Sequence, residues 1–309
     1  MLGAGGIYID GTYGRGGHSG ELLKRLSPAG RLLAFDRDPV AVAHARAQYA
    51  DDPRFEMVSG KFSAMRAALC ERGYEGRVQG VLVDLGVSSP QIDDAERGFS
   101  FMNDGPLDMR MDTQNGMSAA DWINHASVAD MAVVFRELGE ERHAKRIASA
   151  IERERKVNPF ERTQHLAEVV TLANPTWEKH KHPATRVFQA IRIFINDELG
   201  ELRSLLNDVV DMLAPHGRIA VIAFHSLEDR IVKQFLRAQS CGRELPRGVP
   251  QMGGPEGQTM RLVGKAIKPS EKEVSENPRA RSAILRVGEK LGAGDGLPVA
   301  AKLSRGIKI

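Results

Sequence analysis

The chain has 309 residues, of which 42% are hydrophobic and 27% charged, a composition typical of soluble globular proteins. No apolar stretch approaches the ~20 residues of a membrane span, and two cysteines without a CxxC pair or a signal peptide predict a cytoplasmic protein. The net charge of +3 is uneven, because residues 241–309 carry 13 Lys/Arg against 7 Asp/Glu, which makes this last part a candidate surface for a polyanion.

Apolar strand patterns alternate with helical patterns at the N-terminal end, which predicts a parallel sheet. We expect strands at 7–10, 31–36, 55–62, 80–86 and 218–224, and helices at 19–26, 39–50, 63–71 and 185–213. Residues 118–173 have a helical pattern of their own, which predicts an all-helical insertion. Two later runs, 259–265 and 282–287, are expected to pair as sheet-edge strands.

The first strand ends in a carboxylate, Asp10, and continues through a glycine-rich turn into a helix. Glycines at a strand-to-helix turn let the backbone approach a ligand closely. A carboxylate ahead of this turn repels a pyrophosphate and attracts the cationic amino-acid end of S-adenosyl-L-methionine. The turn therefore predicts a methyl-donor pocket.

Three further strands also end in informative residues, Asp36, Phe62 and Asp84. Ligands of open α/β sheets bind outside the carboxyl ends of the strands. Asp36 follows the glycine turn at about 20 residues, the spacing of a carboxylate that binds ribose hydroxyls. Phe62 is placed to stack on adenine, and Asp84 to lie near the reactive end of the donor. The alternatives are a helix cap for each aspartate and a core position for Phe62.

A nicotinamide-dependent oxidoreductase is the rival enzyme class, because it shares the glycine turn and the acidic residue after the second strand. In this chain Gly14-x-Gly16-x-x-Ser19 departs from the G-x-G-x-x-G pattern, and Asp10 precedes the turn. Both features favour the methyl donor.

The segment from Asp84 to Gln91 is where an acceptor is expected to meet the methyl group. Its run Ser88-Ser89-Pro90-Gln91 is loosely similar to the Asn/Asp/Ser-Pro-Pro-aromatic loop of enzymes that methylate exocyclic amines of bases. A carboxylate that accepts the amine N–H favours attack by such a weak nucleophile, so Asp84 is the first catalytic candidate. The spacing of Gly86, Ser88 and Pro90 imitates a serine-hydrolase elbow only in part, because proline replaces the second glycine.

Histidines raise two further possibilities. His225 follows the fifth strand and is a tentative catalytic residue, the alternative being a helix start capped by Ser226 with Asp229 three residues on. His180 and His182 have no carboxylate or cysteine partner at ligand spacing, so we expect a basic turn there and no metal site.

Arginines in the insertion, its junctions and the C-terminal part suit contacts with phosphates and bases. Aromatic residues make up only 6% of the chain, which favours recognition of RNA shape with one extruded base over a stacking platform. Solvated charge remains the alternative for each residue. The candidates for RNA contact are Arg97, Arg110, Lys181, Arg186, Arg192, Arg279 and Arg281.

Long motifs throughout the chain closely resemble those of the bacterial ribosomal RNA small subunit methyltransferase H family, the RsmH/MraW type. The matching runs are residues 8–19, 36–39, 84–101, 105–111, 182–190, 224–230 and 276–282.

The resemblance implies S-adenosyl-L-methionine-dependent N4-methylation of one cytidine in the decoding centre of 16S rRNA, within the small ribosomal subunit. It implies a class I SAM-dependent methyltransferase fold, a Rossmann-like α/β sheet with an inserted helical domain. We place the donor-binding domain at residues 1–107 and 185–309, and the substrate-recognition insertion at 108–184. The implied donor site comprises Gly16, Gly17, His18, Asp36, Phe62, Asp84 and Gln91.

Members of this family usually carry a His-x-Pro-Val-Leu-Leu-x-Glu segment before the first strand, and we expect this chain, which lacks it, to bind donor or RNA more weakly. A non-catalytic rRNA-binding assembly factor with a vestigial donor pocket is the alternative function. The sequence leaves a monomer and a homodimer equally open.

Overall fold

The computed structural model describes residues 5–175, 182–241, 257–293 and 295. The chain divides into two compact units. Unit 1 comprises Met1–Asp36, Ala45–Leu85 and Leu202–Ile309, and unit 2 comprises Arg37–His44 and Gly86–Glu201. Unit 2 thus extends beyond the insertion expected at 108–184, because the segments on either side of it group with the helices.

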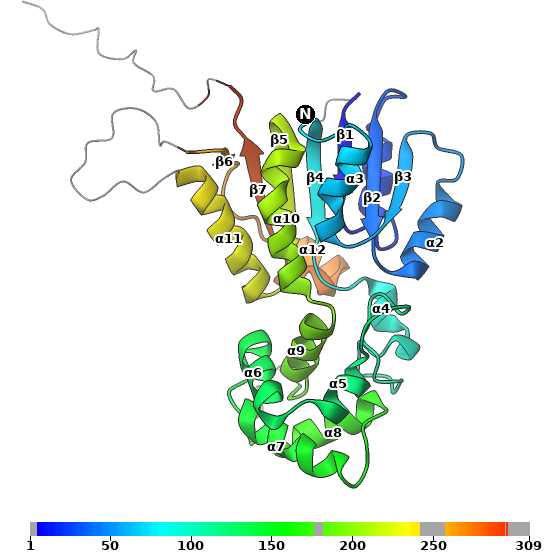
Figure 1. Cartoon of the computed structure of the whole chain (residues 1–309), viewed down its shortest axis with the longest axis vertical. Helices are drawn as coiled ribbons and strands as arrows, with labels where there is room; N and C mark the ends of the chain where they lie inside the picture. The colour runs from blue at the N-terminus through cyan, green and yellow to red at the C-terminus, as the bar shows by residue number, and fades with distance from the viewer. Residues whose placement is uncertain (1–4, 176–181, 242–256, 294, 296–309) are drawn as a thin grey trace, which may run out of the picture. The chain divides into compact units, whose positions relative to one another are not determined.

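A seven-stranded sheet forms the centre of unit 1 (Figure 1). The strands are β1 (Ile7–Asp10), β2 (Arg31–Asp36), β3 (Phe55–Ser59), β4 (Val78–Asp84), β5 (Leu213–Ala223), β6 (Met260–Leu262) and β7 (Ile284–Lys290). Their order is β3-β2-β1-β4-β5-β7-β6, and β1 to β5 run parallel while β7 is antiparallel to both of its neighbours. The predicted Rossmann-like α/β fold is confirmed.

Alternating side chains of the central strands pack on opposite faces of the sheet, as the two-residue period of a strand requires. One face buries Ile9, Leu33 and Phe35 in the largest hydrophobic cluster of unit 1. The other face buries Tyr8 and Leu32 in a smaller cluster. Burial on both faces explains why these strands are continuously apolar in the sequence.

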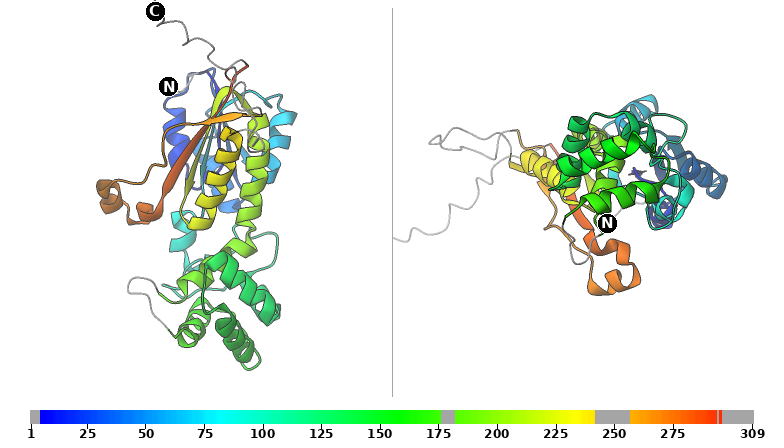
Figure 2. Two further views of the ribbon diagram at one scale, coloured as in Figure 1. Left: turned by 90° about the vertical axis from the view of Figure 1, so that its left-hand side faces the viewer. Right: turned by 90° about the horizontal axis from the view of Figure 1, so that it is seen from below.

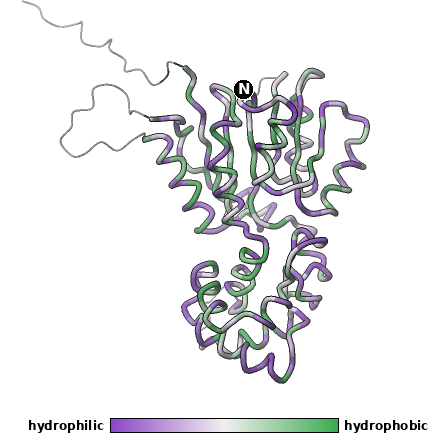
Figure 3. Tube along the Cα trace, in the orientation of Figure 1, coloured by the Kyte–Doolittle hydropathy of each residue, from purple (hydrophilic) through white to green (hydrophobic). Residues whose placement is uncertain are grey.

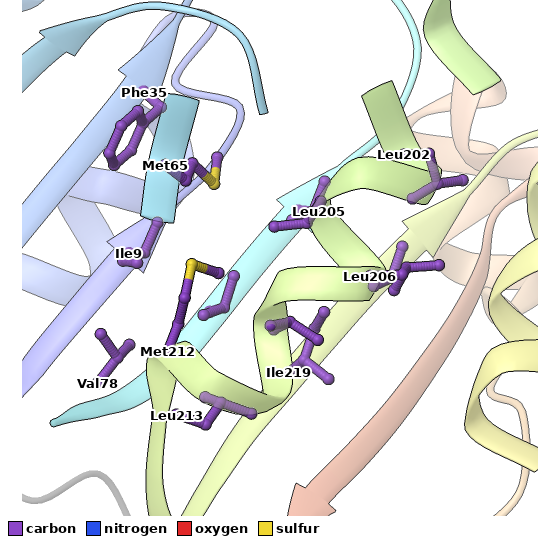
Figure 4. Close-up of a cluster of buried hydrophobic side chains, with 14 of the residues drawn as sticks. Ile9, Phe35, Met65, Val78, Leu202, Leu205, Leu206, Met212, Leu213 and Ile219 are labelled. Atoms are coloured by element: carbon purple, nitrogen blue, oxygen red, sulfur yellow. The ribbon is translucent and has the colours of Figure 1, made fainter. Parts of the chain in front are cut away.

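Helices cover both faces. Those on the Ile9 face are α3 (Met65–Glu71), α10 (Glu198–Met212) from Leu202 onward, and α11 (Ser226–Cys241), whereas α1 (Gly17–Leu23) lies on the Tyr8 face. The left view of Figure 2 looks at the sheet from the β6 side, with α10 and α11 on one face of the strands. Figure 4 shows Leu205 and Leu206 of α10 in this cluster, together with Met65 and Ile219.

The strand order reverses beside β1, because the chain runs outward to β2 and β3 on one side and to β4 and β5 on the other. Asp10 is in register with Ala34 and Leu82, so Asp36 and Asp84 each lie two residues further along the neighbouring strands. The two-residue period places these three carboxylates on the same face of the sheet. Such a reversal is where open α/β sheets bind ligands.

Some predicted boundaries differ from the observed ones. The third strand ends at Ser59, and Phe62 begins the 3-10 helix η1 (Phe62–Ala64). The fifth strand begins at Leu213, earlier than expected. The two C-terminal runs do pair, but only β6 is an edge strand, since β7 lies between β5 and β6.

Unit 2 is built mainly of helices, with a separate hydrophobic core that includes Phe135, Ile147, Phe160 and Ile191. Its elements are α4 (Ser89–Asp93), η2 (Ala95–Arg97), α5 (Ala119–His125), α6 (Val128–Gly139), α7 (Ala144–Arg155), α8 (Thr163–Ala173) and α9 (Thr185–Ile195), while α2 (Pro39–Gln48) and α10 span the division between the units. Hydrophobic residues recur along the helices of both units in Figure 3, as amphipathic packing requires.

The single helix predicted at 185–213 is wrong, because α9 ends at Ile195 and α10 begins at Glu198. Asn196 explains the break. Its buried side chain accepts the Met111 N–H and donates to the Met109 carbonyl, both at 2.8 Å, and Asp197 has a left-handed φ of 46°. The helical periodicity continues across the break, so the sequence pattern gives no sign of it.

In the part of the chain that the structure describes, no helix is both long enough and apolar enough to cross a membrane.

Candidate active site

The glycine turn after β1 is a tight strand-to-helix connection. Gly16 has a φ of 77°, and a Cβ atom there would lie 2.7 Å from the Tyr13 hydroxyl oxygen, so only glycine fits. Gly17 opens α1, and a Cβ atom there would meet nothing within 4 Å. The turn therefore combines a closely packed glycine with one that borders open space.

Asp10 has a different role from the one predicted. Its side chain is 0% exposed and accepts hydrogen bonds from the Ser19 hydroxyl at 2.7 Å and the Thr12 N–H at 3.1 Å. Burial raises the pKa of this carboxyl, although the two hydrogen bonds oppose the shift. The sequence predicted that the charge of Asp10 attracts the cationic end of the donor, and the burial of this side chain leaves it no exposed surface for a direct contact.

Asp36 ends β2 and binds the glycine turn directly. Its Oδ2 accepts the Gly14 N–H at 2.8 Å, and its carbonyl accepts the Gly60 N–H at 3.0 Å. The half-buried carboxylate therefore lies between the turn after β1 and the end of β3. The binding of ribose by Asp36 stays a prediction.

Asp84 and His18 meet at the next strand end. His18 Nε2 lies 3.4 Å from Asp84 Oδ2, and this hydrogen bond is the main reason that the pKa of His18 is raised despite partial burial. Asp84 Oδ1 is buried and has no hydrogen-bond partner among the described residues. The Asp84 side chain as a whole is 33% exposed, and an unpaired carboxylate oxygen is costly, so Asp84 is a candidate to accept a hydrogen bond from a ligand.

Phe62 and His225 both make contacts that stabilise the fold of unit 1. Phe62 is half-buried and packs against the main cluster of unit 1. His225 lies 3.1 Å from Glu228, whose other oxygen accepts the Phe224 N–H at 2.8 Å and the His225 N–H at 3.2 Å. Glu228 thus caps α11, and Asp229, which the sequence placed three residues after a capping Ser226, also pairs with Arg286.

Gln91 belongs to unit 2, where both ends of its amide are engaged. Its Oε1 accepts the Ser88 N–H at 2.9 Å, and its Nε2 donates to Asp38 at 2.7 Å. The same Asp38 oxygen accepts from Arg97 at 2.8 Å. The hydrogen bonds among Gln91, Asp38 and Arg97 therefore hold the expected acceptor loop in place within unit 2.

The predicted RNA contacts are dispersed. Arg97 is only 12% exposed and serves the fold through its ion pair with Asp38. Arg110 pairs with Asp108 at 2.7 Å, and Arg192 with Glu198 at 2.8 Å, while Arg186 donates to a backbone carbonyl.

Two of the remaining predicted RNA contacts are exposed. Arg279 and Arg281 lie on η3 (Pro278–Ser282) of unit 1. Lys181 lies outside the described residues.

Comparison with known proteins decides the family. The model of the MraW methylase family matches residues 1–291. The chain belongs to this family. The MraW-family protein is 57% identical over 287 residues to a ribosomal RNA small subunit methyltransferase H of Thioalkalivibrio sulfidiphilus, covering 93% of this chain and 91% of that one.

A second relative agrees. The methyltransferase of the same name from Shewanella denitrificans is 54% identical, with 93% of this chain and 92% of that one covered. A solved rRNA methylase from Streptococcus thermophilus is 11% identical over 93% of this chain and 87% of its own, with a TM-score of 0.38.

Family membership confirms the predicted methyltransferase and its cofactor, S-adenosyl-L-methionine. The residues of unit 1 fit this cofactor. The unpaired oxygen of Asp84, the open space over Gly17 and the carboxylate of Asp36 border the same turn. A donor of this size is bound along the strand ends in such folds.

Two residues of this site were missed by sequence reasoning. Thr12 accepts the Asp84 N–H on its Oγ1 at 2.7 Å, and Ser19 donates to Asp10. The sequence gives no sign of these hydrogen bonds, because Thr12 is 72 residues from Asp84 and Ser19 is 9 residues from Asp10 in the chain.

Proposed function

We propose that this MraW-family protein methylates N4 of one cytidine in the decoding centre of 16S rRNA, within the small ribosomal subunit. The names of relatives at 57% and 54% identity support the small-subunit rRNA as substrate. The choice of cytosine N4 rests on the family resemblance, and a carboxylate at Asp84 is compatible with methylation of such an amine.

The observation that carries the chemistry is the buried Asp84 Oδ1, which has no hydrogen-bond partner among the described residues. An exocyclic amine of a base is a weak nucleophile, since its lone pair is delocalised into the ring. A carboxylate oxygen that accepts one amine N–H favours a pyramidal nitrogen and stabilises the positive charge that develops on it. Asp84 supplies that oxygen while Thr12 fixes its backbone N–H.

The donor site in this proposal consists of Gly16, Gly17, His18, Asp36, Phe62, Asp84 and Gln91. S-adenosyl-L-methionine supplies an electrophilic methyl group when bound. Asp36 accepts hydrogen bonds from the ribose hydroxyls, and the open space over Gly17 receives the part of the ligand that passes close to the backbone. His18 pairs with Asp84 and holds the orientation of its carboxylate.

The substrate is recognised, in this proposal, by exposed cations. Arg279 and Arg281 are the described candidates in unit 1, and they form phosphate contacts that fix the register of the RNA without reading its sequence. The target base must leave its stack to reach a strand-end pocket. An assembled subunit is therefore a better substrate than free rRNA.

A methyl-transfer assay tests the proposed function. Purified protein is incubated with labelled S-adenosyl-L-methionine and small subunits from a strain that lacks the modification, and the nucleosides are identified by mass spectrometry. We expect a single N4-methylcytidine and no transfer by Asp84→Asn, with Asp52→Asn as a matched control in an ion pair with Arg54. Label in another nucleoside, or full activity of Asp84→Asn, would overturn the assignment.

A further inference from the structure

We propose that Asp10 is a positioning residue, which holds the glycine turn and the backbone of Asp84 through hydrogen bonds and does not contact the donor. This inference rests on the proposed function for its kinetic test, because it assigns Asp84 to the transfer step. In this proposal Asp10 acts by holding the positions of other residues and not by attracting the donor electrostatically.

Asp10 joins the two ends of the glycine turn. Its Oδ1 accepts the Thr12 N–H at 3.1 Å, just after β1, and its Oδ2 accepts the Ser19 hydroxyl at 2.7 Å, in the first turn of α1. Both Asp10 and Ser19 are 0% exposed. One buried carboxylate thus fixes the start and the end of the segment that contains Gly16 and Gly17.

Thr12 extends this arrangement to the catalytic candidate. Its Oγ1 accepts the backbone N–H of Asp84 at 2.7 Å, across the gap between the ends of β1 and β4. The Thr12 backbone is itself held by Asp10. Displacement of Asp10 therefore changes the position of Asp84 without removing any group that contacts substrate or donor.

The negative charge of Asp10 is not needed for these two bonds. In an asparagine the side-chain carbonyl can accept the Thr12 N–H, and the amide can donate to the Ser19 hydroxyl, which accepts as readily as it donates. A carboxylate that attracted the donor cation would lose that attraction in the same substitution. Asp10→Asn and Asp10→Ala therefore separate the two roles.

The first test measures kcat in methyl transfer and the Kd of S-adenosyl-L-homocysteine by calorimetry for the whole chain. We expect Asp10→Ala to lose about tenfold or more in kcat and Asp10→Asn to stay within about threefold of wild type. Equal losses in both variants would mean that the charge acts directly, and wild-type kinetics in a folded Asp10→Ala would mean that the hydrogen bonds do not matter. Either result overturns the proposal.

A second pair of variants decides the question if Asp10→Ala does not fold. Thr12→Val keeps the shape but removes the acceptor of the Asp84 N–H, and Thr12→Ser restores it. We expect kcat to fall about tenfold in Thr12→Val and to recover in Thr12→Ser, with the product Kd changed less than kcat. Thr259→Val is the matched control, since Thr259 precedes β6 at the opposite edge of the sheet. No recovery in Thr12→Ser overturns the proposal.

Failure of the proposed function can be distinguished from failure of the positioning role of Asp10. If the wild-type protein transfers no methyl group to any small subunit, the assignment of the reaction fails. The Kd of S-adenosyl-L-homocysteine then tests the positioning role alone, because the glycine turn is part of the donor site. Unchanged affinity in Asp10→Ala and in Ser19→Ala would contradict that role.

Discussion

Carboxylates at the two ends of the parallel strands in the unit 1 sheet differ in their hydrogen bonding. We call the side where these strands begin the amino edge and the side where they end the carboxyl edge. At the amino edge, Glu289 of β7 is 3% exposed and accepts hydrogen bonds from Arg218 of β5, at 2.7 Å, and from Arg261 of β6. At the carboxyl edge, Asp84 has one oxygen near His18 and the other unpaired.

This difference separates stability from function within one sheet. A buried carboxylate that is fully paired has no capacity left for a ligand, and its removal destabilises the fold because it leaves the partner charges uncompensated. A carboxylate with an unpaired oxygen costs folding free energy, and that cost is recovered only when a ligand donates a hydrogen bond. Variants at the carboxyl edge should therefore reduce donor binding, and variants at the amino edge should reduce stability.

The largest effect is expected from Gly16→Ala. An alanine with a φ of 77° is strained, and its Cβ atom would lie 2.7 Å from the Tyr13 hydroxyl oxygen. The left-handed conformation costs about 1–2 kcal/mol of stability with or without donor, whereas the collision displaces the turn, so we expect at least about thirtyfold weaker donor binding by calorimetry. Gly73→Ala is the control, since Gly73 has a φ of 66° with nothing within 4 Å. Normal affinity in Gly16→Ala would show that the turn does not form the site.

Gly17→Ala tests whether the donor occupies the open space at the start of α1. A Cβ atom there meets no atom within 4 Å, so the melting temperature should not change. If the donor passes over this position, its affinity falls about tenfold. Unchanged affinity would mean that the donor lies elsewhere.

Glu289→Gln should weaken the amino edge without affecting catalysis. Burial alone would raise the pKa of Glu289, but hydrogen bonds from Arg218 and Arg261 hold it below its ordinary value. Because both arginines are half exposed, we expect a loss of about 1–2 kcal/mol in unfolding free energy, measured by denaturant titration at neutral pH.

The lowered pKa of Glu289 also predicts how its contribution to stability depends on pH. A carboxyl whose pKa is lowered by folding contributes stability above its unfolded pKa and loses it as the pH falls through the folded value. The difference between wild type and Glu289→Gln should therefore shrink in acid. A constant difference, or reduced kcat in the variant, would contradict the division between the two edges.

The smallest effect concerns His18. Its hydrogen bond with Asp84 raises the pKa of the imidazole, so His18 keeps a positive charge to higher pH and offsets the charge of Asp84. Raising the pH removes that positive charge and should favour the sulfonium donor over the neutral product S-adenosyl-L-homocysteine, by about threefold. The ratio of the two Kd values between pH 6 and 8.5 measures this effect. In a His18→Gln variant this ratio should not change with pH. If the ratio changed with pH as in wild type, His18 would not be the cause of the effect.

Sequence reasoning predicted the sheet and the edge at which Asp36 and Asp84 lie, because strand patterns and strand-end residues are local signals. The pairing partners were not predictable. Asp10 was assigned to the donor on its charge, whereas its burial depends on Ser19 of the following helix. The break at Asn196 depends on a segment more than 80 residues earlier in the chain, which no periodicity reveals.

The central claim is that the methyl donor binds at the carboxyl edge of the unit 1 sheet and not at its amino edge. Calorimetric titration of S-adenosyl-L-methionine into wild type, Asp36→Ala and Glu289→Gln tests it with one variant from each edge. Hydrogen bonds to a charged group contribute about 1.5–3 kcal/mol, so Asp36→Ala should bind at least about tenfold more weakly, and Glu289→Gln should bind like wild type. Wild-type affinity in Asp36→Ala, or loss of affinity in a folded Glu289→Gln, would contradict the claim.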